Sequence, residues 1–175
     1  MNRLIALGTL FLILLGVNAS IIHKEEQISN GQVVLLQLVP VDPRSLMQGD
    51  YMALRFSINN KIFKKLRSES GNNWKRYLPE VDDGFIVVSL NKDKVATFKA
   101  IYEGQTLSNG EVKMRYRIRK SKIKFATNAF FFEEGTAKVY EQSRYGEFRV
   151  DEKGDLLLVA MRDKNLTRLG EPERL

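Results

Sequence analysis

The chain begins with its longest apolar run, which extends from Leu4 to Val17 behind Arg3. Continued through Ile22, the run has about 19 residues and would be about 28 Å long as an α-helix, which matches the hydrocarbon core of a bilayer. The run has no polar face, and this argues against a buried helix of a soluble domain. The pattern therefore predicts a membrane segment.

Two interpretations of this segment are open. Val17-Asn18-Ala19 has the small residues of a cleavable export signal, with cutting after Ala19. Alternatively, residues 1–26 stay in place as a transmembrane anchor. In both cases Arg3 remains in the cytoplasm, where positive charges flanking a membrane segment tend to stay, and residues 27–175 are delivered to the other side.

Beyond Gln32 the apolar positions mostly follow the period of two that is typical of strands. In residues 50–58 every second side chain is large and apolar, as in a half-buried strand. Further strands are predicted at 32–39 and 111–125, and hairpins at 85–102 and 149–163. The predicted fold is mainly β (α+β): an N-terminal transmembrane helix, then one antiparallel β-rich domain with one or two short helices.

Between the first two strands, the unusual residues suit a short capped turn. Asp42 is a good helix N-cap, and Pro43 follows at the first helical position, where its missing N–H costs nothing. Gly49 can adopt the left-handed conformation that ends such a turn.

Other segments break the strand pattern. Residues 61–84 predict a long loop after a short helical turn. Residues 133–148 have helical spacing and predict a short helix that ends on Gly146. The polar residues 165–175 predict a frayed tail.

Composition narrows the chemistry. The chain has no cysteine, which excludes disulfide-linked partners, thiolate metal sites and a cysteine nucleophile. The single histidine, His23, cannot build a multi-histidine centre and suits a membrane-flanking position, so we expect no metal and no cofactor. The net charge of +7 favours anionic neighbours, and export of the domain argues against nucleic acid.

A basic stripe is predicted in residues 111–125, where cations alternate with apolar residues and so share one strand face. The cations are Lys113, Arg115, Arg117 and Arg119, and the opposite face holds Val112, Met114, Tyr116 and Ile118. The stripe either attracts anions, at a lipid surface or an acidic partner loop, or is an ordinary solvated face that discourages edge pairing.

Carboxylates offer a second candidate site. Asp42 or Asp50 could meet a later glutamate across the fold, for acid–base chemistry or for a hard cation. The glutamates concerned are Glu133, Glu134 and Glu141. The simpler interpretation gives these residues conformational roles: a cap, a turn and the negative start of a helix.

A third constellation interleaves aromatic and arginine residues near the end of the predicted helix. Its members are Tyr140, Glu141, Arg144, Tyr145 and Arg149. Such residues often anchor a binding partner, and they also often form a cluster at the edge of a core.

Two separated motifs carry a resemblance to a known family. The stretch PVDPRSLMQGDYMALRF and the later FFFEEGTAKVYEQSRYGEFRVDEKGDLLLV resemble the GDYXXLXY family of bacterial membrane-anchored proteins. Gly49, Asp50, Tyr51 and Leu54 match the motif. Phe56 stands where the family name has tyrosine, so we infer that the ring matters there more than the hydroxyl.

The resemblance implies an uncleaved anchor that carries an extracytoplasmic domain, and it favours the anchor over the cleaved signal. It implies a single pass through the bacterial inner membrane, with the N-terminus in the cytoplasm and the domain in the periplasm. The resemblance does not point to any particular activity.

We expect a binding or accessory module for another envelope component, such as an integral membrane protein. The alternative is an envelope hydrolase-like enzyme with a carboxylate site around Asp50 and Glu133, near Arg44. The candidate binding residues are Asp42, Pro43, Arg44, Gly49, Asp50, Tyr51, Leu54, Phe56, Glu133, Tyr140, Glu141, Arg144 and Tyr145.

Overall fold

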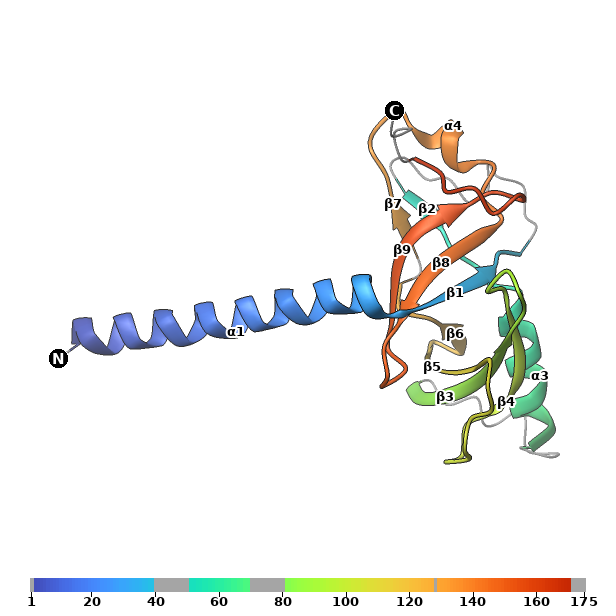
Figure 1. Ribbon diagram of the computed structural model, residues 1–175, viewed down its shortest axis with the longest axis horizontal. Helices are drawn as coiled ribbons and strands as arrows, with labels where there is room; N and C mark the ends of the chain where they lie inside the picture. The colour runs from blue at the N-terminus through green and yellow to red at the C-terminus, as the bar shows by residue number, and fades with distance from the viewer. Residues whose placement is uncertain (1, 40–50, 70–80, 128, 171–175) are drawn as a thin grey trace.

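A long N-terminal helix, α1 (Asn2–Asn30), projects from a domain of antiparallel strands (Figure 1). The computed structural model describes residues 2–39, 51–69, 81–127 and 129–170. Within these residues, one helix is long and apolar enough to cross a membrane, and it spans Ile5–Asn30. Its side chains are exposed from Ile5 to Glu26. The predicted apolar helix, the mainly β domain and its few short helices are confirmed.

The strands of the described residues form three antiparallel sheets. The first has the order β1-β8-β9 and contains β1 (Gln32–Gln37), β8 (Tyr145–Val150) and β9 (Leu156–Arg162). The second has the order β4-β3-β5-β6 and contains β3 (Val81–Leu90), β4 (Ala96–Ile101), β5 (Glu111–Arg119) and β6 (Lys122–Lys124). The third pairs β2 (Tyr51–Ala53) with β7 (Ala129–Phe131).

Several predicted strands are confirmed. β1 lies in the predicted strand 32–39. β3 and β4 form the predicted hairpin at 85–102, and β8 and β9 form the predicted hairpin at 149–163. These segments are recognisable locally because each buries one face against the core.

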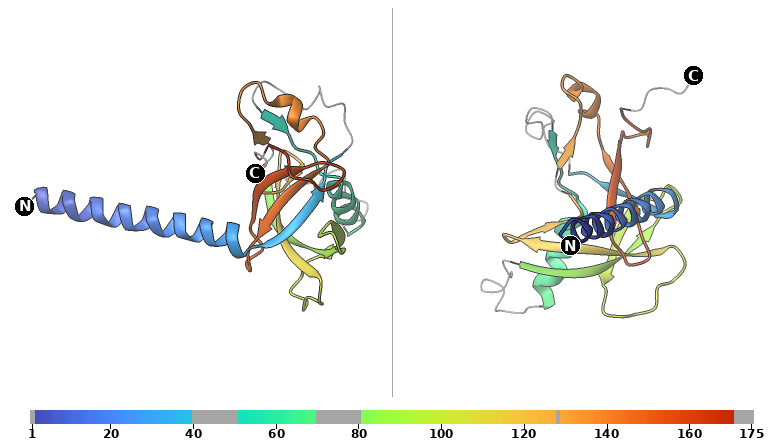
Figure 2. Two further views of the ribbon diagram at one scale, coloured as in Figure 1. Left: turned by 45° about the horizontal axis from the view of Figure 1, so that its top comes forward. Right: turned by 90° about the vertical axis from the view of Figure 1, so that its left-hand side faces the viewer.

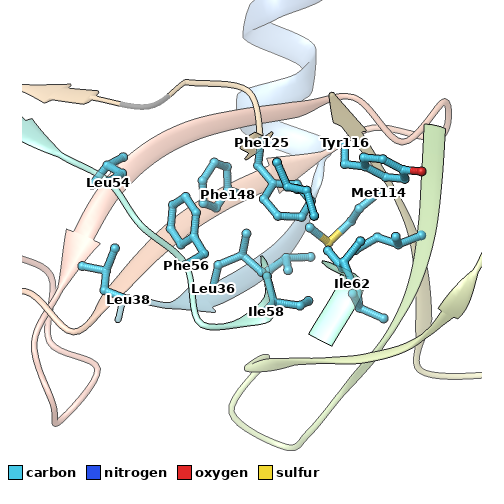
Figure 3. Packing of buried hydrophobic residues seen from close by; sticks show 14 of the residues in the cluster. Leu36, Leu38, Leu54, Phe56, Ile58, Ile62, Met114, Tyr116, Phe125 and Phe148 are labelled. Atoms are coloured by element: carbon cyan, nitrogen blue, oxygen red, sulfur yellow. The ribbon is translucent and has the colours of Figure 1, made fainter. Parts of the chain in front are cut away.

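The core lies between the two larger sheets (Figures 1 and 3). Phe56 is at its centre, with its ring edge-on to Phe125 at 6.2 Å and to Phe148 at 5.5 Å between centroids. Its environment is apolar, which agrees with the inference that the ring is what matters at this position. Leu54, also from the family motif, is buried in the same cluster.

The strand predicted at 50–58 is shorter than expected, although its inward face is correct. Met52, Leu54, Phe56 and Ile58 are all buried. The chain nevertheless leaves β2 after Ala53, and Ile58 begins helix α3 (Ile58–Glu69). The short helical turn predicted after residue 61 is part of α3, which is longer than predicted because Ile62 packs fully buried in the core. The long loop predicted after this turn lies mostly outside the described residues.

The alternating stretch 111–125 contains a turn that the pattern did not reveal. Lys120 and Ser121 both have positive φ, 51° and 57°, so the chain folds back between β5 and β6. Two such central residues are typical of a two-residue hairpin turn of type I′. That turn normally contains asparagine or glycine, so lysine and serine at these two positions carry no turn signal.

The helix predicted at 133–148 is mostly wrong. Only α4 (Ala137–Tyr140) is helical, and Tyr145 already begins β8. Gly146 is not a C-cap: it lies inside β8, opposite Leu36. A β-carbon there would lie 3.1 Å from the Phe148 ring and 3.2 Å from the Phe56 ring, so close packing accounts for the glycine.

The predicted frayed tail is also wrong for residues 165–170. The Asp163 carboxylate accepts the N–H groups of Asn165 and Thr167, both at 2.8 Å, and closes a turn. The chain then returns along β9, where the Leu169 N–H donates to the Met161 carbonyl at 2.8 Å.

Candidate functional site

The end of α1 is fixed to the β8–β9 hairpin rather than joined to it by a loose linker. Gln27 is 3% exposed, and its side-chain amide donates to the carbonyls of Asp155 at 2.8 Å and Arg149 at 3.3 Å. Lys24 donates to the Gln27 side-chain oxygen at 2.9 Å. One buried side chain of the helix therefore holds both ends of the hairpin turn.

Gly31 allows this close approach at the point where α1 ends. Its N–H donates to the Gln27 carbonyl at 3.0 Å, and a β-carbon on Gly31 would collide with that oxygen. The guanidinium of Arg149 donates to the Gly31 carbonyl at 3.1 Å. The helix end, the glycine and β8 thus form one hydrogen-bonded unit, which we call the junction (Gln27, Gly31, Arg149 and Asp155).

The junction continues into the sheet that contains the basic stripe. The Arg115 N–H donates to the Gly154 carbonyl at 2.8 Å, and the Arg115 side chain pairs with Asp155 at 3.1 Å. The Asp155 N–H is itself held by the Asp151 carboxylate at 2.8 Å. The orientation of α1 is therefore coupled to that of β5.

An open pocket of about 380 Å³ lies beside the junction. Its wall includes His23, Glu26 and Gln27 from α1 and Asp151, Glu152 and Lys153 from the β8–β9 turn. Charges of both signs line it. Among the described residues, no group of three or more histidine or carboxylate side chains could hold a metal ion.

The basic stripe lies on the outward face of β5. Val112, Met114, Tyr116 and Ile118 are buried on the opposite face. The register of β6 adds two lysines to the outward face, because Lys124 lies opposite Arg117 and Lys122 lies opposite Arg119.

Several cations of the stripe have partners along its length. Lys113 lies over the rings of Phe85 and Tyr102, with its ammonium 5.2 and 5.4 Å from their centroids. The Arg119 guanidinium donates to Asp83 at 2.6 Å. This hydrogen bond lowers the pKa of Asp83 and raises the pKa of Arg119, so the pair stays ionised.

Aromatic residues form a separate surface around β2 and β7. Phe131 is 72% exposed, and its ring lies 5.7 Å from that of Tyr51, the tyrosine of the GDY motif. The two phenylalanines next to Phe131 in the chain contact Tyr140 instead. The ring of Tyr140 stacks on that of Phe132 and is tilted against that of Phe130, with centroid distances of 5.2 and 5.0 Å. Burial, with a smaller effect of Glu133, raises the pKa of Tyr140.

The aromatic and arginine constellation does not form one cluster. Tyr140 is buried among phenylalanines, whereas Arg149 belongs to the junction. Arg144 is exposed and donates to the carbonyl of Ser143 at 2.8 Å, Glu141 is exposed, and Tyr145 begins β8. The core-edge interpretation describes Tyr140 best.

The carboxylate pair predicted across the fold falls partly outside the described residues. This applies to Asp42, Pro43, Arg44, Gly49 and Asp50. Glu133 and Glu134 are exposed and precede α4. The catalytic alternative therefore stays a prediction.

Two buried polar residues belong to none of the three candidate sites predicted from the sequence. They are Gln27, at the predicted domain boundary, and Glu147. Glu147 is 3% exposed and accepts from Arg162 at 2.7 Å, with Arg168 at 3.8 Å. Arg168 comes from the returning tail, so no local pattern could have identified this carboxylate as buried.

A sequence model described as GDYXXLXY protein matches residues 13–161. The match covers the second half of α1 and nearly all of the β-rich domain. No curated protein and no solved structure matches the chain.

Proposed function

This chain belongs to the GDYXXLXY protein family, and on that premise we propose that it is a single-pass inner-membrane protein whose extracytoplasmic domain binds and assists an integral membrane protein. The anchor would comprise residues 1–26 and the domain residues 27–175. The observation that carries the proposal is the junction, which fixes an exposed apolar helix to the domain.

The uncleaved anchor is supported by the continuity of α1. The helix runs without a break through Ala19 to Asn30. Cutting after Ala19 would fall inside this helix and would leave only residues 20–30 of α1 on the domain. Arg3 before the apolar segment favours a cytoplasmic N-terminus.

The partner surface we propose is the exposed edge of β2 and β7 that carries Tyr51 and Phe131, which we call the aromatic ribbon. It lies on the side of the domain from which α1 extends (Figures 1 and 2), where a membrane protein beside the anchor would meet it. Exposed aromatic side chains are the residues that most often supply binding energy at interfaces. Phe131 is the central candidate, and Tyr51 supports its ring.

Site-specific photocrosslinking in native membranes tests this function. A crosslinking residue at Phe131 should capture one reproducible membrane protein, and the same protein should be captured from Val139, which is 41% exposed near the same ribbon. Lys64, on α3 at the far side of the domain, is the matched control position. Equal capture from all three positions, or none from Phe131, would contradict the proposal.

The hydrolase-like alternative has no specific support in the described residues. Its central residues, Asp50 and Arg44, lie outside them, and Glu133 is exposed. An Asp50→Asn variant distinguishes this alternative from a purely conformational role of Asp50.

A further inference from the structure

The basic stripe ends in a concentration of charge at the β5–β6 turn. Five cations gather there, and we call them the basic end. They are Arg117, Arg119, Lys120, Lys122 and Lys124. Among the described residues, the nearby carboxylates on β3 are Asp82 and Asp83, so five cations face two carboxylates and the described part of this surface has a surplus of three positive charges.

Among the described residues, no carboxylate pairs with the lysines of the basic end. Asp83 is occupied by Arg119. Within the part of the chain that the structure describes, no ion pair involves Lys120, Lys122 or Lys124. Lys120 and Lys122 are exposed.

The turn itself departs from the usual residue choice. Lys120 has a φ of 51°, a left-handed conformation that costs a residue with a side chain roughly 1–2 kcal/mol. Asparagine and glycine are the usual residues at such positions. Strained residues often occur where function requires a particular side chain, and here the strain presents a lysine at the tip of the hairpin.

The basic end lies on the membrane side of the domain. Arg119 pairs in register with Val81, the first residue of β3, and β3 begins on the side from which α1 extends (Figures 1 and 2). Only residues 23–30 separate the apolar segment from the domain, and as a helix they span about 12 Å. The headgroup layer on each side of the hydrocarbon core is about 5–8 Å thick, so this side of the domain stands close to the lipid surface.

We infer that the basic end docks on anionic phospholipid headgroups of the leaflet in which α1 ends, and that this contact sets the orientation of the domain. Charge complementarity selects this occupant, because a cationic surface near an anionic leaflet gains from each lysine. Val81, which is 66% exposed beside Arg119, adds an apolar contact at the same level. The inference rests on the proposed anchorage by α1.

The test uses the full chain in lipid nanodiscs. Because the protein has no cysteine, a single Ser121→Cys substitution places one fluorophore at the turn. Ser68→Cys, on α3 far from the membrane side, is the reference position. Quenching by a lipid with a nitroxide on its headgroup, at the same fraction in every disc, reports contact with the surface.

The expected result compares discs of phosphatidylcholine alone with discs that contain 30% phosphatidylglycerol. Quenching at position 121 should increase in the anionic discs and fall at high salt, whereas quenching at position 68 should not change. Each lysine contributes about a fivefold change in the docking equilibrium. Lys120→Gln with Lys122→Gln should therefore weaken docking by about 25-fold.

The matched control removes two lysines elsewhere. Lys61→Gln with Lys64→Gln on α3 makes the same change in net charge and should leave quenching at position 121 unchanged. An equal loss in both double variants, or equal quenching in the two kinds of disc, would overturn the inference. These outcomes leave the anchorage intact, whereas a full chain that fails to float with vesicles of either composition would overturn the anchorage as well.

Discussion

Replacing Gln27 with alanine should release the end of α1 from the domain without unfolding either. The substitution removes the side-chain hydrogen bonds to the carbonyls of Asp155 and Arg149, at 2.8 and 3.3 Å. Alanine is a good helix former, so α1 itself should persist. The change therefore isolates the junction from the rest of the fold.

The magnitude follows from the two hydrogen bonds. A typical intramolecular hydrogen bond contributes about 0.5–1.5 kcal/mol net, so the pair contributes about 1–3 kcal/mol. The Asp155 carbonyl keeps another donor, the Asp151 N–H at 3.1 Å, which removes part of the penalty. We expect about 2 kcal/mol, which corresponds to a roughly 25-fold increase in the equilibrium constant for opening of the junction.

Hydrogen–deuterium exchange of the full chain in nanodiscs measures this constant. When amides exchange through local opening, their rate is proportional to the opening equilibrium. Amides at the end of α1, including that of Gly31, should therefore exchange about 25-fold faster in the variant. Gln37→Ala is the matched control, because Gln37 is exposed at the end of β1.

The reasoning would be refuted if Gln27→Ala changed exchange at the end of α1 no more than Gln37→Ala does. That result would mean that the Arg149–Gly31 hydrogen bond and the continuity of the chain hold the junction together without the Gln27 side chain. Global loss of protection throughout the strands would also refute it, because the junction would then be part of the folding core.

Three further predictions concern stability and chemistry. Glu147→Gln removes the buried carboxylate that pairs with Arg162, and it should lower the free energy of unfolding, measured in urea, by about 2 kcal/mol. The control Glu152→Gln, in the exposed turn, should change the free energy of unfolding by less than about 0.5 kcal/mol. Burial raises the pKa of Tyr140, so its contribution to stability is fully present below the unfolded pKa of about 10 and should be lost as the pH rises through the folded pKa. The thermal stability of a Tyr140→Phe variant should therefore depend less on pH between about pH 9 and 11 than that of the unchanged protein. Identical pH profiles of the two proteins would contradict the burial argument. Asp50→Asn should abolish activity at an unchanged melting temperature if the hydrolase-like alternative holds, whereas lowered stability with no separate functional loss would indicate a purely conformational role.

The parts of the fold that could be predicted are those decided within one segment. The apolar leader and the alternation in β5 are visible in the sequence because burial of one face imposes a period on neighbouring residues. The basic stripe was located for the same reason, although its interpretation as a binding surface stays a prediction.

The parts that could not be predicted depend on distant segments. Gly146 looks like a helix terminator until Phe56 and Phe148 are seen to pack against it. Glu147 is covered by the returning tail, and Gln27 meets the carbonyls of a turn more than a hundred residues away. The β5–β6 turn was missed because lysine and serine stand where glycine or asparagine would have marked it.

The junction has a mechanical consequence. Because the end of α1 is fixed to the β8–β9 hairpin, the helix and the domain should move together as one rigid body. A tilt of about 20°, which is ordinary for a single span, would swing the far side of a domain about 30 Å across through roughly 10 Å. In the proposed anchorage, a neighbour that tilts α1 within the bilayer would thereby redirect the proposed aromatic ribbon outside it, and a signal could cross the membrane without a change of shape in the domain.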